Sequence, residues 1–470
     1  MLARVRAQNR SAGNGVIVEL SPELVPLVNA RTPRYTSYPT APVWQDGVDP
    51  AWQDECMAQV QSPASVYVHL PFCAEQCSFC ACNQVVAGRR EAGTRYLDAL
   101  ERQVRGLALP VERLTVQRIH LGGGTPTWHT PEELARLVGL LNERFDLGED
   151  GELDVEADPE ITTDAQVDAL AELGASRISM GVQSFDDGVL EAVGRPQRAE
   201  RIGAILGRAR QHGMRGLNID LMYGLPRQVP QVFARDLDQV IALRPDRLAI
   251  FGYAHVPWMK PHQKRLEDYG LSTAETRLEL FLMAHQRMAE AGYQAIGFDH
   301  FALPDDELAV AAREGRLHRN FMGYTTLPDL ELIGLGTSAI SQFRGGFFQQ
   351  TSHLSRWWKA IESGQPTIEK GMRLSWDDQL RQALIMGLMC NLRLDWAQVS
   401  ARWGIEPQVY LAADLERLRP LQDLGLVEVD DQGLRVTDRG RILVRNVAAA
   451  FDVYLHKPGV EAGPRFSRAI

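Results

Sequence analysis

Residues Val66 to Asn83, VYVHLPFCAEQCSFCACN, carry the most specific pattern in the chain. The apolar run at their start, Val66 to Leu70, predicts a strand, and the loop after it holds four of the six cysteines. Cys73, Cys77 and Cys80 follow the spacing C-x3-C-x2-C. This spacing lets three thiolates meet at one site from a single short loop.

Three neighbouring thiolates favour a soft metal centre. A structural zinc site, a disulfide pair and cysteines that only fill space are the alternatives. A zinc site normally has two separated ligand pairs, whereas the remaining Cys56 and Cys390 each stand alone. An iron-sulfur cluster usually takes four thiolates, so three would leave one iron open to another molecule.

Composition and charge limit the classes of protein to consider. The 470 residues, 45% hydrophobic and 23% charged, are typical of a globular protein with a large domain and one or two smaller ones. No apolar run approaches the ~18 residues of a membrane span, and the start of the chain has no signal-peptide core. Cysteines gathered in one loop suit a reducing compartment, so we expect a cytoplasmic protein. The net charge of -10 argues against nucleic acid as a partner.

From Val66 onward, apolar runs alternate with amphipathic segments, which predicts repeated βα units and a parallel sheet. Thr130, Pro131 and Glu133 mark the start of one such helix, whose apolar face is expected to continue to Phe145. The expected strands are Val66–Leu70, Arg118–Leu121, Leu153–Ala157, Arg177–Val182, Leu217–Met222 and Arg247–Phe251. The predicted fold class is α/β, an open (β/α)6 partial TIM-like barrel.

In such barrels, ligands bind beyond the C-terminal ends of the strands. A lone polar residue there is more often a solvated or capping group, and a tight turn alone would explain glycines. Several polar residues around one barrel mouth instead favour a shared cavity. After the cysteine loop, the successive strand ends hold Gly122-Gly123-Gly124-Thr125-Pro126, then Glu156 and Asp158, then Gln183, then Asp220, then Ala254 and His255.

The remaining segments suggest three domains. Residues 1–55 form an N-terminal arm that includes the aromatic, proline-rich stretch Arg31 to Trp44, and residues 56–360 form the barrel and its extension. Residues 361–470 predict a mostly helical, winged-helix-like domain with a hairpin between Leu426 and Thr437 and a final helix capped by Thr437. Residues 371–470 hold 13 basic and 13 acidic side chains, so this domain is a poor phosphate binder and is expected to be a lid or packing domain.

The C-x3-C-x2-C spacing resembles the signature of the radical S-adenosylmethionine (SAM) superfamily. Cys82, which completes a C-x-C pair, the preceding VYVHLPFC and the segment PRYTSYPT are similar to the oxygen-independent coproporphyrinogen III dehydrogenases, or oxidases. The resemblance implies that Cys73, Cys77 and Cys80 hold a [4Fe-4S] cluster whose fourth iron binds SAM. An electron from the cluster would cleave SAM into methionine and a 5'-deoxyadenosyl radical, which abstracts a hydrogen atom.

The resemblance also implies the reaction and its partners. Two propionate side chains of coproporphyrinogen III would lose CO2 and become vinyl groups, giving protoporphyrinogen IX in haem biosynthesis, with SAM as oxidant. An electron donor and an electron acceptor are implied but not identified, and we expect a monomer without a membrane span.

By the same resemblance, Cys82 is the expected catalytic thiol. Arg34, Tyr35 and Tyr38 of the arm are expected to contact the substrate. The family normally has glutamine where this chain has Met322, so we expect two SAM molecules with a weakened second site. The expected SAM-binding residues are Tyr67, Phe79, Gly123, Gly124, Thr125, Glu156, Gln183, Arg195, Asp220, Ala254 and Ile340.

Three other functions remain open. A related haem-binding chaperone typically has an aromatic residue at the position of Cys82 and lacks the PRYTSYPT arm. Another porphyrin-modifying radical SAM enzyme would share the barrel and the cluster. A zinc-binding structural protein would need neither the barrel nor the cluster.

Overall fold

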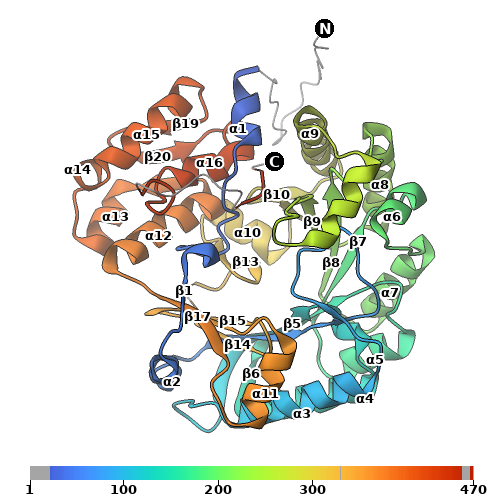
Figure 1. The fold of residues 1–470 in the computed structure, drawn as a ribbon. Helices are drawn as coiled ribbons and strands as arrows, with labels where there is room; N and C mark the ends of the chain where they lie inside the picture. The colour runs from blue at the N-terminus through green and yellow to red at the C-terminus, as the bar shows by residue number, and fades with distance from the viewer. Residues whose placement is uncertain (1–21, 329, 458–465, 469–470) are drawn as a thin grey trace.

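The computed structural model describes residues 22–328, 330–457 and 466–468, as an α/β body joined to a helical C-terminal part (Figure 1). The start of the chain, which we expect to lack a signal peptide, lies outside these residues. No helix within the described ranges is long and apolar enough to cross a membrane.

The six predicted strands are confirmed, and they lie side by side in chain order. They are β2 (Ala64–Leu70), β5 (Leu114–Gly123), β6 (Phe145–Ala157), β7 (Arg177–Gln183), β8 (Gly216–Tyr223) and β9 (Arg247–Gly252). All five neighbouring pairs are parallel. The helices that connect them are α3 (Glu91–Arg105), α4 (Pro131–Arg144), α5 (Asp164–Glu172), α6 (Asp187–Val193), α7 (Ala199–Gln211) and α8 (Pro230–Leu243). These helices cover the outside of an open partial barrel (Figure 1).

The sheet extends beyond the predicted strands to 13 in the described part of the chain. β14 (Leu332–Leu335) pairs parallel with β2, and beyond it follow β15 (Ile340–Phe343), β16 (Gly346–Gln350), β17 (Ile368–Arg373) and β1 (Gln45–Asp46). On the other edge, β9 pairs with β11 (His300–Ala302), which pairs with β10 (Gln294–Ile296). The division into residues 1–55, 56–360 and 361–470 stays a prediction, and both outer segments contribute a strand to this sheet.

The remaining elements lie in the connections between these strands and helices. They are η1 (Pro22–Leu24), α1 (Val25–Asn29), η2 (Ala41–Val43), α2 (Pro50–Ala58), β3 (Phe72–Cys73), β4 (Val85–Val86), η3 (Pro126–Trp128), η4 (Pro261–Tyr269), α9 (Ala274–Glu290), α10 (Glu307–Glu314), β12 (His318–Asn320), β13 (Gly323–Thr325) and α11 (Leu354–Glu362).

Helix α4 shows how local sequence sets an element. Thr130 and Glu133 form the predicted capping box, with Pro131 in the first turn. The prediction that the helical face continues to Phe145 is wrong, because the helix ends at Arg144 and Phe145 begins β6.

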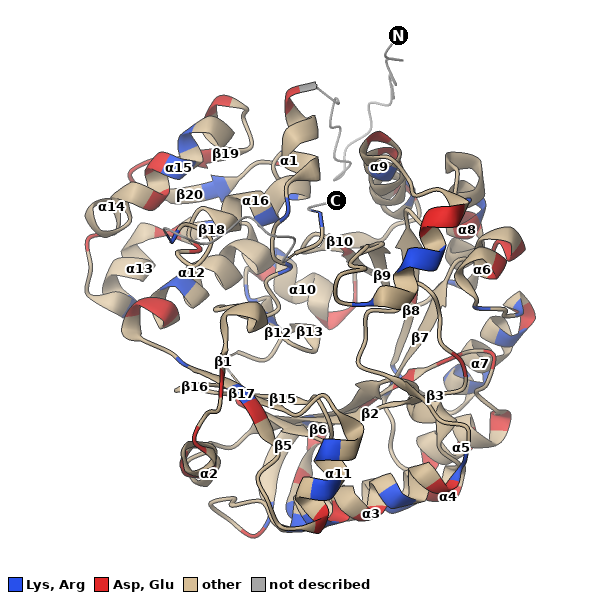
Figure 2. Ribbon diagram, viewed as in Figure 1, with Lys and Arg blue, Asp and Glu red and all other residues tan. Residues whose placement is uncertain are grey.

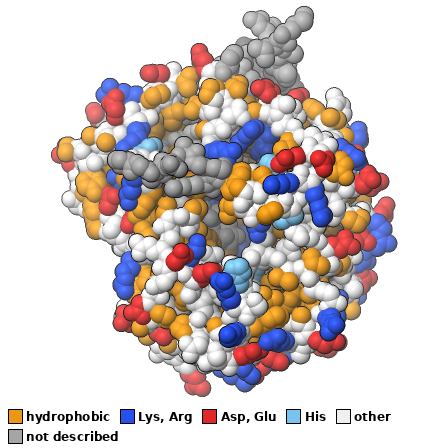
Figure 3. Space-filling model, viewed as in Figure 1, with side chains coloured by type: hydrophobic (Ala, Val, Ile, Leu, Met, Phe, Trp, Pro, Cys, Tyr) orange, Lys and Arg blue, Asp and Glu red, His pale blue; other side chains and the backbone are white. Residues whose placement is uncertain are grey.

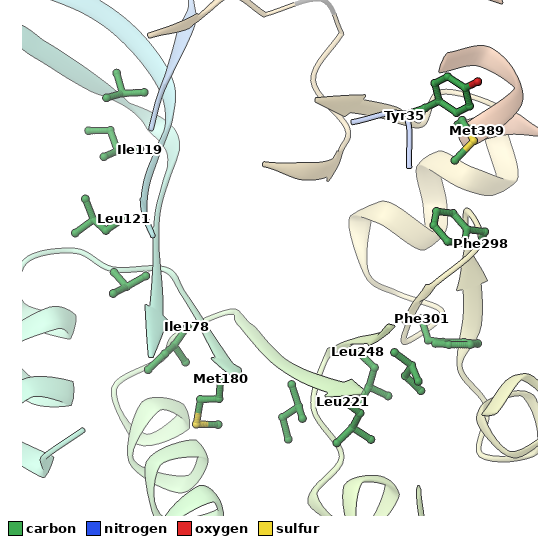
Figure 4. Packing of buried hydrophobic residues seen from close by; sticks show 14 of the residues in the cluster. Tyr35, Ile119, Leu121, Ile178, Met180, Leu221, Leu248, Phe298, Phe301 and Met389 are labelled. Atoms are coloured by element: carbon green, nitrogen blue, oxygen red, sulfur yellow. The ribbon is translucent and has the colours of Figure 1, made fainter. Parts of the chain in front are cut away.

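Alternation along the strands separates the hydrophobic core from a polar barrel interior. Successive side chains of a strand point to opposite faces. Ile119 and Leu121 of β5 belong to the buried core, together with Ile178 and Met180 of β7 (Figure 4). His120 lies between them on the opposite face of β5.

The C-terminal part contains the predicted hairpin, formed by β19 (Val427–Val429) and β20 (Gly433–Val436). β18 (Arg393–Asp395) completes a three-stranded sheet. The helices around it are α12 (Trp376–Asn391), α13 (Trp396–Trp403), α14 (Pro407–Tyr410), α15 (Ala412–Asp423) and α16 (Val444–Ala449). The prediction that Thr437 caps the final helix is wrong, because the N-cap position of α16 is Leu443. The Thr437 hydroxyl instead accepts the Gly440 N–H at 3.0 Å in the turn before η5 (Arg441–Leu443).

Charged side chains of both signs alternate along the outer helices α3 and α4 (Figure 2). The face in Figure 3 likewise shows basic and acidic side chains interspersed. This face therefore shows no broad basic patch, and the absence of a nucleic-acid partner stays a prediction.

Candidate active site

A pocket of about 290 Å³ lies at the C-terminal ends of the barrel strands. It is bounded by the cysteine loop, the glycine segment after β5 and the ends of β6, β7 and β8. The lining residues include Cys73, Cys77, Phe79, Cys80, Cys82, Gly123, Gly124, Thr125, Glu156, Asp158, Ser179, Gly181, Gln183, Arg195 and Asp220.

Each of the three predicted ligand thiols has a different setting in this pocket. The Cys73 Sγ lies 3.5 Å from the Thr125 hydroxyl, and burial raises the pKa of the Cys73 thiol to about 11. The Arg195 guanidinium donates to the Cys77 Sγ at 3.3 Å. A hydrogen bond with Cys82 lowers the pKa of the Cys80 thiol to about 7. Cys82 therefore lies beside the three-thiol group and faces the same pocket.

The conformation of the cysteine loop is fixed by side chains at the start of η4. Gln263 donates to the Phe79 carbonyl, His262 to the Cys80 carbonyl and Lys260 to the Cys82 carbonyl, each at 2.8 Å. Because these bonds hold backbone rather than thiols, the three sulfur atoms stay available to a ligand.

The glycines at the end of β5 are required by close contacts within the protein. A Cβ at Gly123, whose φ is +113°, would lie 2.5 Å from the His69 ring, and one at Gly124 would lie 2.6 Å from the Pro71 backbone. Glycine at these two positions is therefore required by the protein's own packing. The absence of side chains there lets the cysteine loop and the end of β5 pack together behind the pocket.

Polar atoms on the opposite wall lack protein partners. Gln183 has a φ of +70°, and its buried Oε1 has no hydrogen-bond partner; the Nε of Arg195 also has none. The guanidinium of Arg195 is otherwise held by Asp158 at 3.0 Å. Leaving such groups unsatisfied costs about 1–3 kcal/mol each, so the pocket is suited to a polar ligand. Burial raises the pKa of Asp220 to about 7.

Comparisons with known proteins agree with this geometry. The model of the radical SAM superfamily matches residues 67–240, and that of the HemN C-terminal domain matches residues 374–443. The oxygen-independent coproporphyrinogen III oxidase of Salmonella typhimurium is 42% identical over 449 residues, which cover 95% of this chain and 98% of that protein. The Escherichia coli K12 protein of the same name is 41% identical over the same length and coverage.

The chain belongs to the family of oxygen-independent coproporphyrinogen III oxidases. A solved structure of the Escherichia coli coproporphyrinogen III oxidase HemN, described as a radical SAM enzyme, matches with a TM-score of 0.88 at 39% identity. That match covers 93% of this chain and 99% of the other. The predicted family and fold class are thus confirmed.

The residues present fit the cofactors of this family, a [4Fe-4S] cluster and SAM. All six cysteines are free, so the disulfide alternative is not supported. No three His, Cys, Asp or Glu side chains of the described ranges gather around one ion position, as a mononuclear zinc site requires. The three thiols instead stand around a cavity, an arrangement that suits a cluster with one thiolate on each of three irons.

Most of the predicted SAM-binding residues line the pocket, and three do not. The Tyr67 hydroxyl lies 3.0 Å from His69 Nδ1, on the barrel side of the glycine segment. Ala254 accepts a hydrogen bond from Gln263 through its carbonyl, and Ile340 lies in β15 opposite Gln349. The contacts of all eleven residues with SAM remain predictions.

The three arm residues differ in position. Arg34 donates to the Gly252 carbonyl at 2.8 Å, at the end of β9. The buried Tyr35 donates to Asp452 at 3.1 Å, and the buried Tyr38 packs edge-on against Tyr454. The buried Tyr38 hydroxyl has no protein hydrogen-bond partner. The substrate contacts of Arg34, Tyr35 and Tyr38 stay predictions.

Sequence reasoning missed the polar residues behind the pocket wall. His69 donates to the Asn83 carbonyl at 2.8 Å, and His120 lies 3.2 Å from Glu156. Both histidines alternate with apolar residues inside predicted strands. This alternation could have predicted that both histidines point into the barrel, since every second side chain of a strand lies on the same face.

Proposed function

We propose that this protein converts coproporphyrinogen III to protoporphyrinogen IX by oxidative decarboxylation of two propionate side chains. The observation that carries the proposal is a pocket in which Cys73, Cys77 and Cys80 face Gln183 and Arg195, in a chain similar to this family over 95% of its length. Bound there, the cluster and SAM supply the one-electron chemistry that removes a hydrogen atom from the propionate carbon next to the ring.

The protein's own residues would bind SAM and orient it in the pocket. Glu156 accepts the Gly123 N–H at 2.9 Å through Oε2, and its Oε1 lies 3.2 Å from His120 Nε2. Each carboxylate oxygen can accept a second hydrogen bond, and Glu156 lines the pocket. It is suited to hold the amino group of SAM. Gln183 and Arg195 offer a buried acceptor and a buried donor without protein partners, which suit the polar ends of a second SAM. Two SAM molecules are therefore part of the proposal.

The substrate side requires local positive charge, because the protein as a whole carries -10. Arg34 supplies it at the barrel mouth, where it lies 6.0 Å from the Phe251 ring centre. A guanidinium can pair with a carboxylate through two parallel hydrogen bonds. Arg34 is thus suited to hold one propionate.

Cys82 distinguishes this proposal from a haem-binding chaperone. Its thiol lies against Cys80 and lines the pocket, so it can exchange a proton or hydrogen atom with a bound substrate. We further propose a cytoplasmic monomer that receives electrons from one carrier and passes the substrate's electrons to another acceptor.

The test is anaerobic turnover. Reconstituted protein, reductant, SAM and coproporphyrinogen III are incubated, and protoporphyrinogen IX and methionine are quantified. We expect both products to accumulate together. Methionine without any porphyrin product would contradict the substrate assignment, and haem binding without turnover would favour the chaperone.

A further inference from the structure

A line of alternating charges runs through the barrel interior to the pocket wall. Arg118 of β5 forms an ion pair with Asp154 of β6. The Nδ1 of His120 lies 3.8 Å from the same carboxylate, and its Nε2 donates to Glu156 Oε1 at 3.2 Å. Glu156 Oε2 then accepts the Gly123 N–H. His120 therefore lies between two carboxylates, one structural and one at the pocket.

Packing leaves the His120 ring little freedom. The ring stacks against Tyr67 with centroids 5.8 Å apart and planes 21° from parallel. A Cβ at Gly122 would lie 2.9 Å from both His120 Nε2 and the Glu156 carboxyl carbon. Gly122 is thus the residue that lets this pair form.

The charge of His120 follows from its neighbours. Burial by itself lowers the pKa of His120, but Asp154 and Glu156 outweigh burial and raise it to about 9. The groups facing His120 and these two carboxylates are Tyr67 and His69 of β2, Arg118 of β5, Arg177 of β7 and Asp220 of β8. Burial lowers the pKa of His69, which accepts from Tyr67 and donates to Asn83 as a neutral ring. Two neighbouring histidines thus carry different charges at neutral pH.

We propose that His120 is the positioning residue for Glu156: its ring, stacked on Tyr67 and placed between Asp154 and Glu156, fixes the carboxylate that holds the amino group of SAM. The inference rests on the proposed function, since it concerns the same pocket. His120 itself touches Glu156 and Tyr67 and does not line the pocket. Its removal should therefore weaken SAM binding without loss of the cluster.

The first test measures SAM affinity and cluster content separately. His120→Leu and His120→Gln proteins are reconstituted, assayed for iron and sulfide, and titrated with labelled SAM by equilibrium dialysis. We expect full clusters and a dissociation constant raised about tenfold or more in His120→Leu, the usual size of effects from residues that orient a ligand. The effect should be smaller in His120→Gln, whose amide still donates to Glu156.

Two comparisons separate positioning from general destabilisation. His129→Leu breaks another histidine-glutamate pair, in which His129 Nδ1 lies 3.1 Å from Glu133 outside the pocket, and should leave SAM affinity unchanged. In a Glu156→Gln background, His120→Leu should have almost no further effect on affinity. Equal losses in the His129 variant, or full additivity with Glu156→Gln, would overturn the proposal.

A second readout requires neither cofactor nor activity. Nitrogen-15 NMR of histidine-labelled, cluster-free protein at neutral pH should show His120 protonated on both ring nitrogens and His69 neutral, with both signals assigned by substitution. A neutral His120 would overturn the proposal even if the variants fail to fold. If wild-type protein binds no SAM while His120 is charged, the proposed function fails and the electrostatic result stands.

Discussion

The cysteine loop and the N-terminal arm are both irregular segments rich in reactive or polar side chains. The loop presents these side chains to a pocket, whereas the arm buries two of its tyrosines. The loop turns Cys73, Cys77 and Cys80 toward a pocket while its backbone is held by η4. The arm buries Tyr35 and Tyr38 in the protein. Composition therefore does not tell which irregular segment contacts a ligand, whereas the spacing of like side chains within a few residues does.

The contacts of the arm explain the difference. Arg445 of α16 donates to the Pro33 carbonyl at 2.9 Å, and Tyr35 donates to Asp452. In Figure 1 the arm passes between the C-terminal helices and the barrel. The arm thus joins these two parts, and Arg34 is the arm residue that reaches the end of β9.

The largest expected effect is loss of the cluster. Cys80→Ala removes one of three iron ligands, so reconstituted protein should lose most of its iron and sulfide and all turnover. Cys390→Ala is the matched control, because Cys390 is buried in α12 away from the pocket. Full cluster content in Cys80→Ala would exclude Cys80 as a ligand.

Cys82→Ser should show that Cys82 is needed for substrate turnover but not for assembly of the cluster. The hydroxyl keeps the shape of the thiol but does not exchange hydrogen as readily, so we expect a full cluster, normal SAM binding and no protoporphyrinogen IX. Iron analysis, dialysis and product assay measure the three quantities. Normal turnover would leave Cys82 as a residue that fills space.

Tyr35→Phe tests the role given to the arm. The change leaves buried Asp452 without its tyrosine donor, and the free energy of unfolding should fall by about 1–3 kcal/mol. Urea unfolding of cluster-free protein measures it, and SAM affinity should stay unchanged. Tyr454→Phe removes a comparable bond to Asp378 within the C-terminal part and serves as control. Unchanged stability with loss of turnover would instead indicate that Tyr35 contacts the substrate.

The same contrast shows what the sequence could reveal. The six barrel strands were predictable because each is an apolar or alternating apolar-polar run and amphipathic helical segments lie between them. The three cluster cysteines were predictable because they lie within eight residues of one another. The strands β14 to β17 were missed because they are short and interrupted by glycines such as Gly334 and Gly371. The packing of Tyr35 was not predictable, since its partner Asp452 is 417 residues away.

Met322→Gln carries the smallest expected effect. Met322 lies in the turn between β12 and β13, where its N–H donates to Asn320 at 2.8 Å, and it is not among the residues that line the pocket. The family's glutamine at this position could still reach a ligand above the pocket, and methionine offers no amide hydrogen bond. One neutral hydrogen bond contributes about 0.5–1.5 kcal/mol, so its loss should weaken a second SAM site at most about tenfold.

We therefore expect two SAM molecules per clustered protein, with the second bound more tightly in Met322→Gln and the first unchanged. Equilibrium dialysis with labelled SAM across a wide concentration range measures both sites, and Met259→Gln, at an exposed methionine, is the control. Gln183, Arg195 and Asp220 are retained at the pocket wall, which is why a single substitution should not abolish the site. A stoichiometry of one that rises to two in the variant would show that those three side chains do not suffice.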